Sequence, residues 1–103
     1  MPKKPKQSAL TKSAKGQECQ IRIPGVCNFD SETTVPAHLP GGGMGMKHSD
    51  IHIAYACSAC HDAVDGRNHD VYDQYAIDEL KLMHLEGMVR TQILMLKAGL
   101  IKI

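Results

Sequence analysis

Four cysteines have the spacing of a metal site. Cys57 and Cys60 are separated by two residues, so one turn can present both thiolates to adjacent corners of a tetrahedron. Cys19 and Cys27 flank the turn Pro24-Gly25, which is a looser version of the same arrangement. Four thiolates close a structural Zn²⁺ site and leave no position open for chemistry. The spacing therefore predicts one zinc ion bound by four cysteines, with two disulfides or scattered buried thiols as the alternatives.

Histidines and acids cluster around the same segment. His61 directly follows Cys60, and Asp65 falls four residues later, on the same face of a short helix. His69 lies eight residues beyond His61, while His38 ends an extended run and Asp50 begins another. An imidazole on a strand facing an imidazole and acids on a helix can hydrolyse a phosphodiester, with a divalent ion to stabilise charge and a neutral histidine to accept a proton. The alternative is a set of surface and capping residues around a zinc ribbon.

The chain has 103 residues, of which 43% are hydrophobic, and this length fits one small domain. Its aromatic side chains are Phe29 and three tyrosines, with no tryptophan, so the core is thin. A small domain with a thin core often needs a metal or a crosslink for stability. The metal site predicted above would supply that stabilisation.

The N-terminal segment differs in charge from the rest of the chain. Residues 1–16 contain five lysines and no acid, which leaves seven basic and eleven acidic residues in the remainder. We expect residues 1–16 to be a flexible basic arm and residues 17–103 to be a single zinc-braced domain. Lysines of the arm, together with Arg22, Lys47 and Arg67, would contact nucleic-acid phosphates, although a solvated tail explains the same composition.

Periodicity predicts a β-rich first half followed by helices, which is an α+β organisation. Proline and glycine residues in the segment 40–45 predict an irregular loop after His38. Gly87 is a candidate break in the longest helical pattern. The predicted strands are 18–23, 33–39, 49–56 and 100–103, and the predicted helices are 58–64 and 71–98.

The long helical pattern carries two neighbouring apolar stripes between residues 77 and 96. Such width suits a helix that crosses a core and also meets a second copy, so a homodimer through the C-terminal helices is possible. No apolar run is long enough to cross a membrane, and the basic N-terminus has no apolar stretch typical of a secretory signal. We therefore expect a cytoplasmic protein with reduced cysteines.

Three segments resemble a known family. They are Glu18-Cys19-Gln20-Ile21-Arg22-Ile23-Pro24-Gly25-Val26-Cys27-Asn28, Ala56-Cys57-Ser58-Ala59-Cys60-His61-Asp62 and Leu85-Glu86-Gly87-Met88-Val89-Arg90-Thr91-Gln92. With their spacing, they resemble the HNH (His-Me finger) endonucleases, and most closely the small prophage-encoded YbcO-like nucleases. The resemblance spans nearly all of the chain after the basic arm. It implies a ββα-metal core braced by the four-cysteine zinc site, with C-terminal helices, in a protein of a bacterial host cell.

The resemblance also implies roles for individual residues. His38 corresponds to the general base and His61 to a ligand of a catalytic Mg²⁺ or Mn²⁺ ion, while imidazole ligands also suit Zn²⁺ or Ni²⁺. Position 37, where the superfamily has a further metal ligand, is alanine. The candidates for the missing ligand are Asp50, Asp65 and His69. The implied activity is metal-dependent hydrolysis of DNA that leaves 5′-phosphate ends.

Two other functions remain open. A non-catalytic zinc module that binds nucleic acid or protein would keep the four cysteines and the basic arm. A phage structural protein with a degenerate HNH site would be consistent with Ala37.

Overall fold

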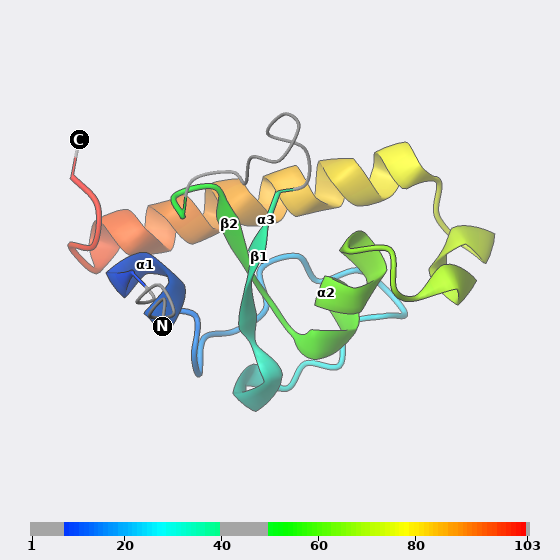
Figure 1. The fold of residues 1–103 in the computed structure, drawn as a ribbon, viewed down its shortest axis with the longest axis horizontal. Coiled ribbons are helices and arrows are strands. Elements are labelled where there is room, and N and C mark those ends of the chain that lie inside the picture. The colour runs from blue at the N-terminus through cyan, green and yellow to red at the C-terminus, as the bar shows by residue number, and fades with distance from the viewer. Residues whose placement is uncertain (1–7, 40–49, 103) are drawn as a thin grey trace, which may run out of the picture.

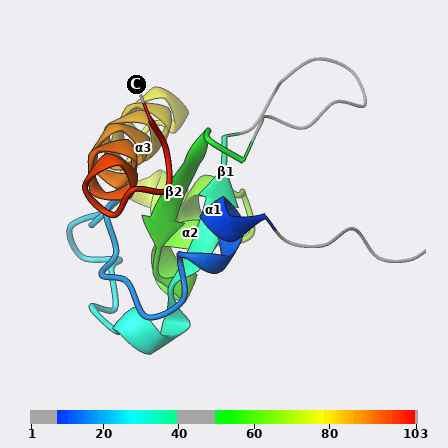
Figure 2. The ribbon, with the colours of Figure 1, turned by 90° about the vertical axis from the view of Figure 1, so that its left-hand side faces the viewer.

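Two short antiparallel strands form the centre of the fold in the computed structural model, which describes residues 8–39 and 50–102. Strand β1 (Val35–His38) pairs with β2 (Ile53–Ala56), with Val35 opposite Ala56 and His38 opposite Ile53. Helix α2 (Ser58–Val64) follows β2 almost directly, so the strand leads into the cysteine-containing turn. The long helix α3 (Ile77–Lys97) lies along one face of the hairpin, while α1 and α2 lie toward the other (Figures 1 and 2). The predicted α+β class is confirmed.

Strand β2 is buried on both faces because different parts of the chain cover each face. Ile53 and Tyr55 pack with Ala14 and Met95, whereas the alternate residues Ala54 and Ala56 join the cluster around the cysteines. The Thr91 hydroxyl on α3 accepts a hydrogen bond from the Tyr55 backbone N–H at 2.9 Å. This bond fastens the middle of α3 to the hairpin.

The segment 18–23 is irregular, so the predicted strand there is wrong. Cys19, Ile21 and Ile23 are buried as the alternation requires, and the Gln20 N–H bonds to the Tyr55 carbonyl at 2.7 Å. Arg22, however, has a left-handed backbone with φ of +52°. A residue in that conformation ends an extended segment, although the apolar pattern continues through it.

The ends of the chain also differ from expectation. A short helix, α1 (Ala9–Lys12), is capped by Ser8 and followed by the buried Ala14, so the segment 8–16 belongs to the packed structure rather than to a free arm. Residues 100–102 form no strand. The rest of the predicted arm (1–7), the glycine-rich loop with Lys47, and Ile103 lie outside the described residues.

The predicted helix 71–98 is two elements. A 3₁₀ helix covers His69–Asp73, and α3 begins at Ile77, where the Glu79 carboxylate accepts a hydrogen bond from the Ala76 N–H. A shorter 3₁₀ helix, Ser31–Thr33, precedes β1. Within the described residues, no helix is long and apolar enough to cross a membrane.

Gly87 does not break α3; it allows another segment to approach the helix closely. A Cβ at this position would lie 2.9 Å from Ile21 Cγ1 and 3.2 Å from both Gln20 O and Ile21 Cα. Arg90, one turn later, donates from Nε and Nη2 to the same Gln20 carbonyl at 2.9 and 2.6 Å. The two residues hold the segment that carries Cys19 against α3.

Gly87→Ala should lower the free energy of unfolding. Overpacking costs about 1–3 kcal/mol, while alanine gains only about 1 kcal/mol of helix propensity over glycine. We expect the steric cost to prevail because Tyr55 and Arg90 fix the Gln20 backbone. Urea unfolding measures the change, and the double variant Gly87→Ala/Ile21→Ala is the control. If Gly87→Ala alone is more stable than wild type, the close approach of residues 20–21 does not exclude a side chain at position 87.

Candidate functional site

The four cysteine sulfurs form one cluster. All four Sγ atoms lie within 4.8 Å of one another, and the thiols are free rather than paired as disulfides. Cys57 Sγ lies 3.7 Å from Cys27 Sγ, close to the edge of about 3.8 Å in a tetrahedron of Zn–S bonds. Cys57 also caps α2, because its sulfur accepts a hydrogen bond from the Cys60 N–H at 3.4 Å. This cluster could hold a metal ion, as the spacing predicted.

Two backbone N–H groups point at the sulfurs from residues with left-handed backbones. The Arg22 N–H donates to Cys19 Sγ at 3.4 Å, and the Phe29 N–H donates to the Cys27 sulfur. Arg22 and Phe29, with φ of +52° and +55°, are the non-glycine residues with positive φ in the described part of the chain. N–H groups directed at sulfur stabilise thiolates, which are the form that binds a metal.

The cluster does not ionise uniformly without a cation. A hydrogen bond from Cys60 lowers the pKa of Cys19 to about 4, and the same contact, together with burial, raises the pKa of Cys60. Burial raises the pKa of Cys27 to about 11. Four crowded sulfurs can all lose their protons only when a positive ion compensates their charge. The donor set thus suits a soft divalent cation.

His38 and Asp50 form a second feature, at the open end of the hairpin. His38 Nε2 donates to Asp50 Oδ1 at 2.9 Å, and both side chains are partly exposed. The hydrogen bond from His38, followed by one from Ser8, lowers the pKa of Asp50. With Nε2 as the donor, a neutral His38 carries its lone pair on Nδ1. Asp50, predicted as a possible metal ligand, here contacts the predicted base.

The remaining predicted ligands are spread over α2 and the segment that follows it. His61 lies at the middle of α2, with its N–H bonded to Cys57 O at 2.9 Å. Asp65 caps that helix and pairs with Arg67 at 2.9 Å, whereas the His69 ring contacts the edge of Tyr72. Within the described ranges, the histidines and acids do not form a second group close enough to hold an ion, as the cysteines do.

His84 lies in the segment of the two apolar stripes and is a functional candidate that was not predicted from the sequence. It is 2% exposed, and its Nε2 donates to the Ala37 carbonyl at 2.9 Å, directly beside His38 in the chain. Burial lowers the pKa of His84, and the charges of His61 and His38 act in the same direction. A neutral, buried imidazole therefore supports β1 beside the predicted base. A histidine at a core-facing position of an apolar stripe was the available signal.

The His84 pKa predicts a pH effect on stability. Because the folded-state pKa lies below the unfolded value, the unfolded chain takes up the proton first as the pH falls below about 6.5. The free energy of unfolding should therefore decrease with acidification. His84→Gln, which keeps an N–H donor for Ala37, should flatten this slope in urea titrations between pH 7.5 and 5. An unchanged slope would show that His84 does not titrate in this way.

The fold and the cysteine cluster define a small α+β protein with a four-thiol centre formed by the segment 19–27 and the start of α2. The chain belongs to the YbcO family, whose model, described as "Putative nuclease YbcO", matches residues 8–100. It is 51% identical over 96 residues to "Putative nuclease YbcO" of Escherichia coli K12 and, equally, to "Putative nuclease ybcO" of Enterobacteria phage 82. Each match covers 90% of this chain and 96% of the relative.

A solved structure has the same fold. It is described as a putative bacteriophage protein from Escherichia coli K-12 MG1655, and its TM-score with this chain is 0.74 at 46% identity. The match covers 87% of this chain and 99% of that structure. The predicted membership of the YbcO family is therefore confirmed.

Proposed function

We propose that this protein is a metal-dependent DNA endonuclease of the HNH type, encoded by a phage or prophage. The observation that carries the proposal is the His38–Asp50 pair at 2.9 Å, on a hairpin that leads directly into the cysteine turn and His61. The family name and the names of both relatives refer to nucleases. A hairpin followed by a helix, with histidines on both, suits the ββα-metal core of that superfamily.

His38 would act as the general base. Nδ1 of neutral His38 takes a proton from water, the water oxygen attacks the phosphorus atom, and the bond from phosphorus to the 3′-oxygen breaks. The products are a 5′-phosphate and, after protonation, a 3′-hydroxyl. Asp50 holds the ring and stabilises the imidazolium that forms.

Metal binding is divided between two sites in this proposal. The cysteine cluster fits a structural Zn²⁺, because its sulfurs are crowded, buried or half-buried, and supplied with N–H donors. The expected catalytic Mg²⁺ or Mn²⁺ has one candidate imidazole in His61. Asp50 and His69 are the proposed further ligands; in this structure Asp50 bonds to His38, and the His69 ring contacts Tyr72.

Plasmid nicking tests the activity. Protein dialysed free of loosely bound ions is incubated with supercoiled DNA, with and without Mg²⁺ or Mn²⁺. We expect nicked circles only with added ion, and 5′-phosphate ends that a ligase accepts. Specific DNA binding without cleavage under any ion would favour the non-catalytic zinc module.

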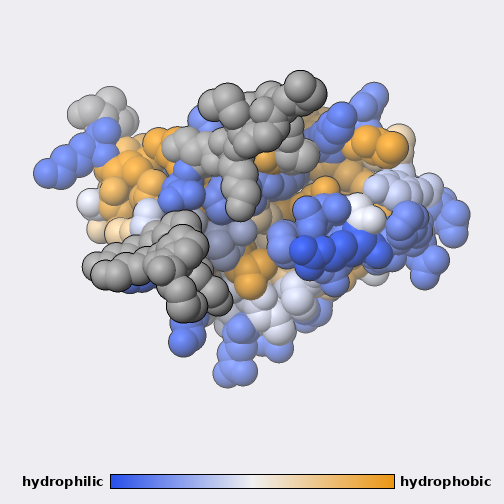
Figure 3. Space-filling view, viewed as in Figure 1, coloured by the Kyte–Doolittle hydropathy of each residue, from blue (hydrophilic) through white to orange (hydrophobic). Residues whose placement is uncertain are grey.

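Hydrophilic side chains cover the surface over α2 and the segment that follows it (Figure 3). Arg67 and Arg22, which we predicted to contact phosphates, already have acidic neighbours in the protein. Arg67 pairs with Asp65, and Arg22 lies 4.0 Å from Glu18. DNA would have to compete with these acids. We therefore expect the affinity for DNA to fall steeply with salt, and this salt dependence to come from lysines more than from Arg22 or Arg67.

We also propose a homodimer through α3. Leu82, Leu85, Val89 and Ile93 form an exposed apolar stripe along the helix, and each side chain is 44–56% exposed. Acids lie at the start of α3 and Lys97 at its end, so two antiparallel copies would bring opposite charges together. Such a stripe typically marks an interface.

Leu85→Glu should shift the protein from dimer to monomer in sedimentation analysis, because a carboxylate would be buried in the apolar contact. Gln74→Glu adds the same charge at an exposed position outside α3 and should leave the sedimentation coefficient unchanged. A monomeric wild-type protein at high concentration would refute the dimer.

A further inference from the structure

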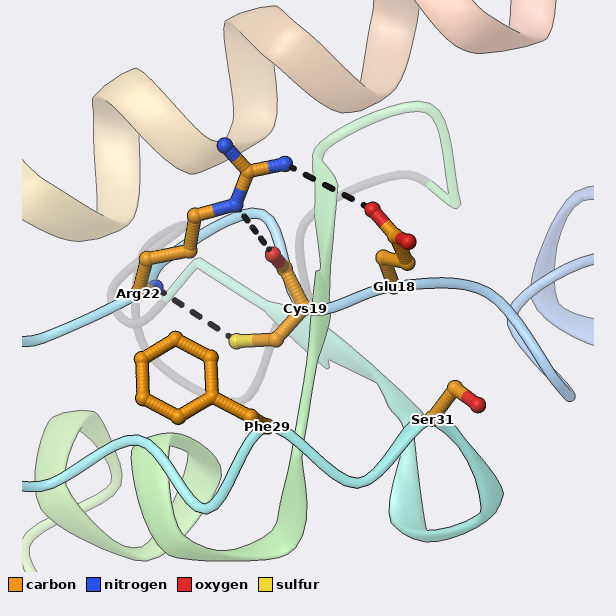
Figure 4. Close-up of a pocket in the computed structure, with 5 residues that line it drawn as sticks. All are labelled: Glu18, Cys19, Arg22, Phe29 and Ser31. Atoms are coloured by element: carbon orange, nitrogen blue, oxygen red, sulfur yellow. Dashed lines mark hydrogen bonds and ion pairs between the residues drawn. The ribbon is translucent and has the colours of Figure 1, made fainter.

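A pocket of about 470 Å³ opens beside the cysteine cluster. Its lining residues are Glu18, Cys19, Arg22, Phe29 and Ser31. In Figure 4 the Phe29 ring lies next to the Arg22 side chain on one side of Cys19, with Glu18 and Ser31 on the other side. The proposed cleavage reaction uses none of these side chains.

Phe29 is unusual in two respects. It is the only phenylalanine in the chain, yet it is 81% exposed. Its backbone also occupies the left-handed region, with φ of +55°, which is unfavourable for a bulky residue. A glycine would make the same turn without strain and without exposing an apolar ring. Packing of the protein therefore does not account for a phenylalanine at this position.

The cysteine sulfurs hold the backbone of two residues that line the pocket. The backbone N–H groups of Phe29 and Arg22 donate to Cys27 and Cys19, so the left-handed turns that project both side chains depend on the sulfurs. Arg22 Nε also donates to the Cys19 carbonyl at 2.9 Å, while half of the side chain stays exposed. An aromatic face and a guanidinium edge are thus held in place before any ligand arrives.

We infer that this pocket binds an unpaired nucleobase, with its ring stacked on Phe29 and its polar edge directed at Arg22, Glu18 and Ser31. The inference rests on the proposed function for its ligand class, a nucleic acid. Aromatic side chains stack on unpaired bases of any sequence, and the donors and acceptors at the rim match the mixed polar edge of a base. In a duplex, neighbouring bases cover the ring faces, so the pocket selects single-stranded segments, ends or flipped bases.

Charge favours a base over a phosphate as the occupant. Glu18 lines the pocket, and Asp30 and Glu32 lie on either side of Ser31 in the chain. The thiolates of an occupied cysteine centre would add further negative charge. One partly engaged arginine does not offset these groups for a phosphate inside the pocket, whereas a neutral base can enter while its flanking phosphates stay outside.

Two substitutions at position 29 test the inference. Phe29→Gly removes the ring and relieves the backbone, so the protein should fold and retain its zinc. Its affinity for a short labelled single strand should fall by about 5- to 150-fold, the range expected for one lost stacking contact, with little change for the matching duplex. Fluorescence anisotropy without added divalent cation measures both affinities. Tyr72→Gly, at another exposed aromatic residue, is the matched control and should bind as wild type.

Phe29→Trp supplies a direct readout, because the chain has no tryptophan. Adding the single strand should quench its fluorescence, and adding the duplex should not; Tyr72→Trp should respond to neither. The inference is overturned if Phe29→Gly binds the single strand as wild type does, if Phe29→Trp is not quenched, or if the wild type binds no single strand. Plasmid nicking by wild type and Phe29→Gly is scored separately. Nicking without single-strand binding would refute only the binding of a nucleobase in this pocket. Phe29-dependent binding without nicking would refute only the proposed endonuclease activity.

Discussion

His38→Ala should lower the rate of plasmid nicking by about 10²–10⁴-fold, the usual cost of losing a general base. The side chain is partly exposed at the end of β1, and its hydrogen bond to Asp50 is at the surface, so the substitution should leave the fold intact. Metal binding should persist, because His38 is not expected to be a ligand. Nicking kinetics in Mg²⁺, together with zinc analysis of the purified variant, measure both effects.

His61→Ala distinguishes the base from the metal ligand. It should weaken Mn²⁺ binding in calorimetric titration, and excess Mn²⁺ should restore part of the nicking activity. Asp73→Asn, at an exposed position in the 3₁₀ helix, serves as the unaffected control. If His38→Ala loses Mn²⁺ binding and His61→Ala keeps it, the two roles are reversed. Nicking at the wild-type rate by both variants would mean that the active site lies elsewhere.

Cys60→Ser should remove the metal and unfold the protein. The purified wild type should contain one zinc per chain, and the variant should contain almost none. The loss should be severe because metal binding and folding are one equilibrium in such centres, where zinc binding is worth about 10–16 kcal/mol in small zinc peptides. Cys60 is fully buried at the start of α2 and contacts both Cys19 and Cys57. A side chain at the protein surface therefore cannot replace it as a metal ligand.

Elemental analysis and thermal unfolding by circular dichroism measure these effects. Ala59→Ser adds a hydroxyl between the two cysteines, keeps all four sulfurs, and should retain both zinc and a cooperative transition. A folded wild-type protein without metal, or mass spectra showing Cys19–Cys27 and Cys57–Cys60 disulfides, would contradict the zinc assignment.

The cysteine cluster was predictable from sequence because the spacing of Cys57 and Cys60 restricts the local geometry to a turn. The hairpin strands and α2 were also predictable from alternation and a short helical pattern. The irregular path of the segment 18–23 was not, because the left-handed turn at Arg22 depends on a sulfur contributed by Cys19. Local periodicity cannot register such a contact.

The environment of His38 was less predictable. The bond to Asp50 joins residues twelve apart, and support from His84 comes from a helix that begins far along the chain. The first contact depends on how β1 and β2 pair, and the second on how α3 packs against the hairpin. The short helix α1 was missed, although its cap Ser8 was a local signal; four residues are too few for a periodic pattern, and the Ser13–Tyr55 hydrogen bond beside it joins residues 42 apart.

The close approach of Gly87 to Ile21 has a consequence for sequence drift within the family. A methyl group at position 87 would lie 2.9 Å from the Ile21 side chain and 3.2 Å from the backbone of residues 20 and 21, so a larger residue at position 87 requires both a smaller side chain at position 21 and a small backbone shift. Position 20 carries no such restriction toward Arg90, because the arginine bonds to a backbone carbonyl that every residue possesses. Changes at position 87 should therefore be accompanied by changes at position 21, which is 66 residues earlier in the chain. Packing against α3 places no such limit on the side chain at Gln20.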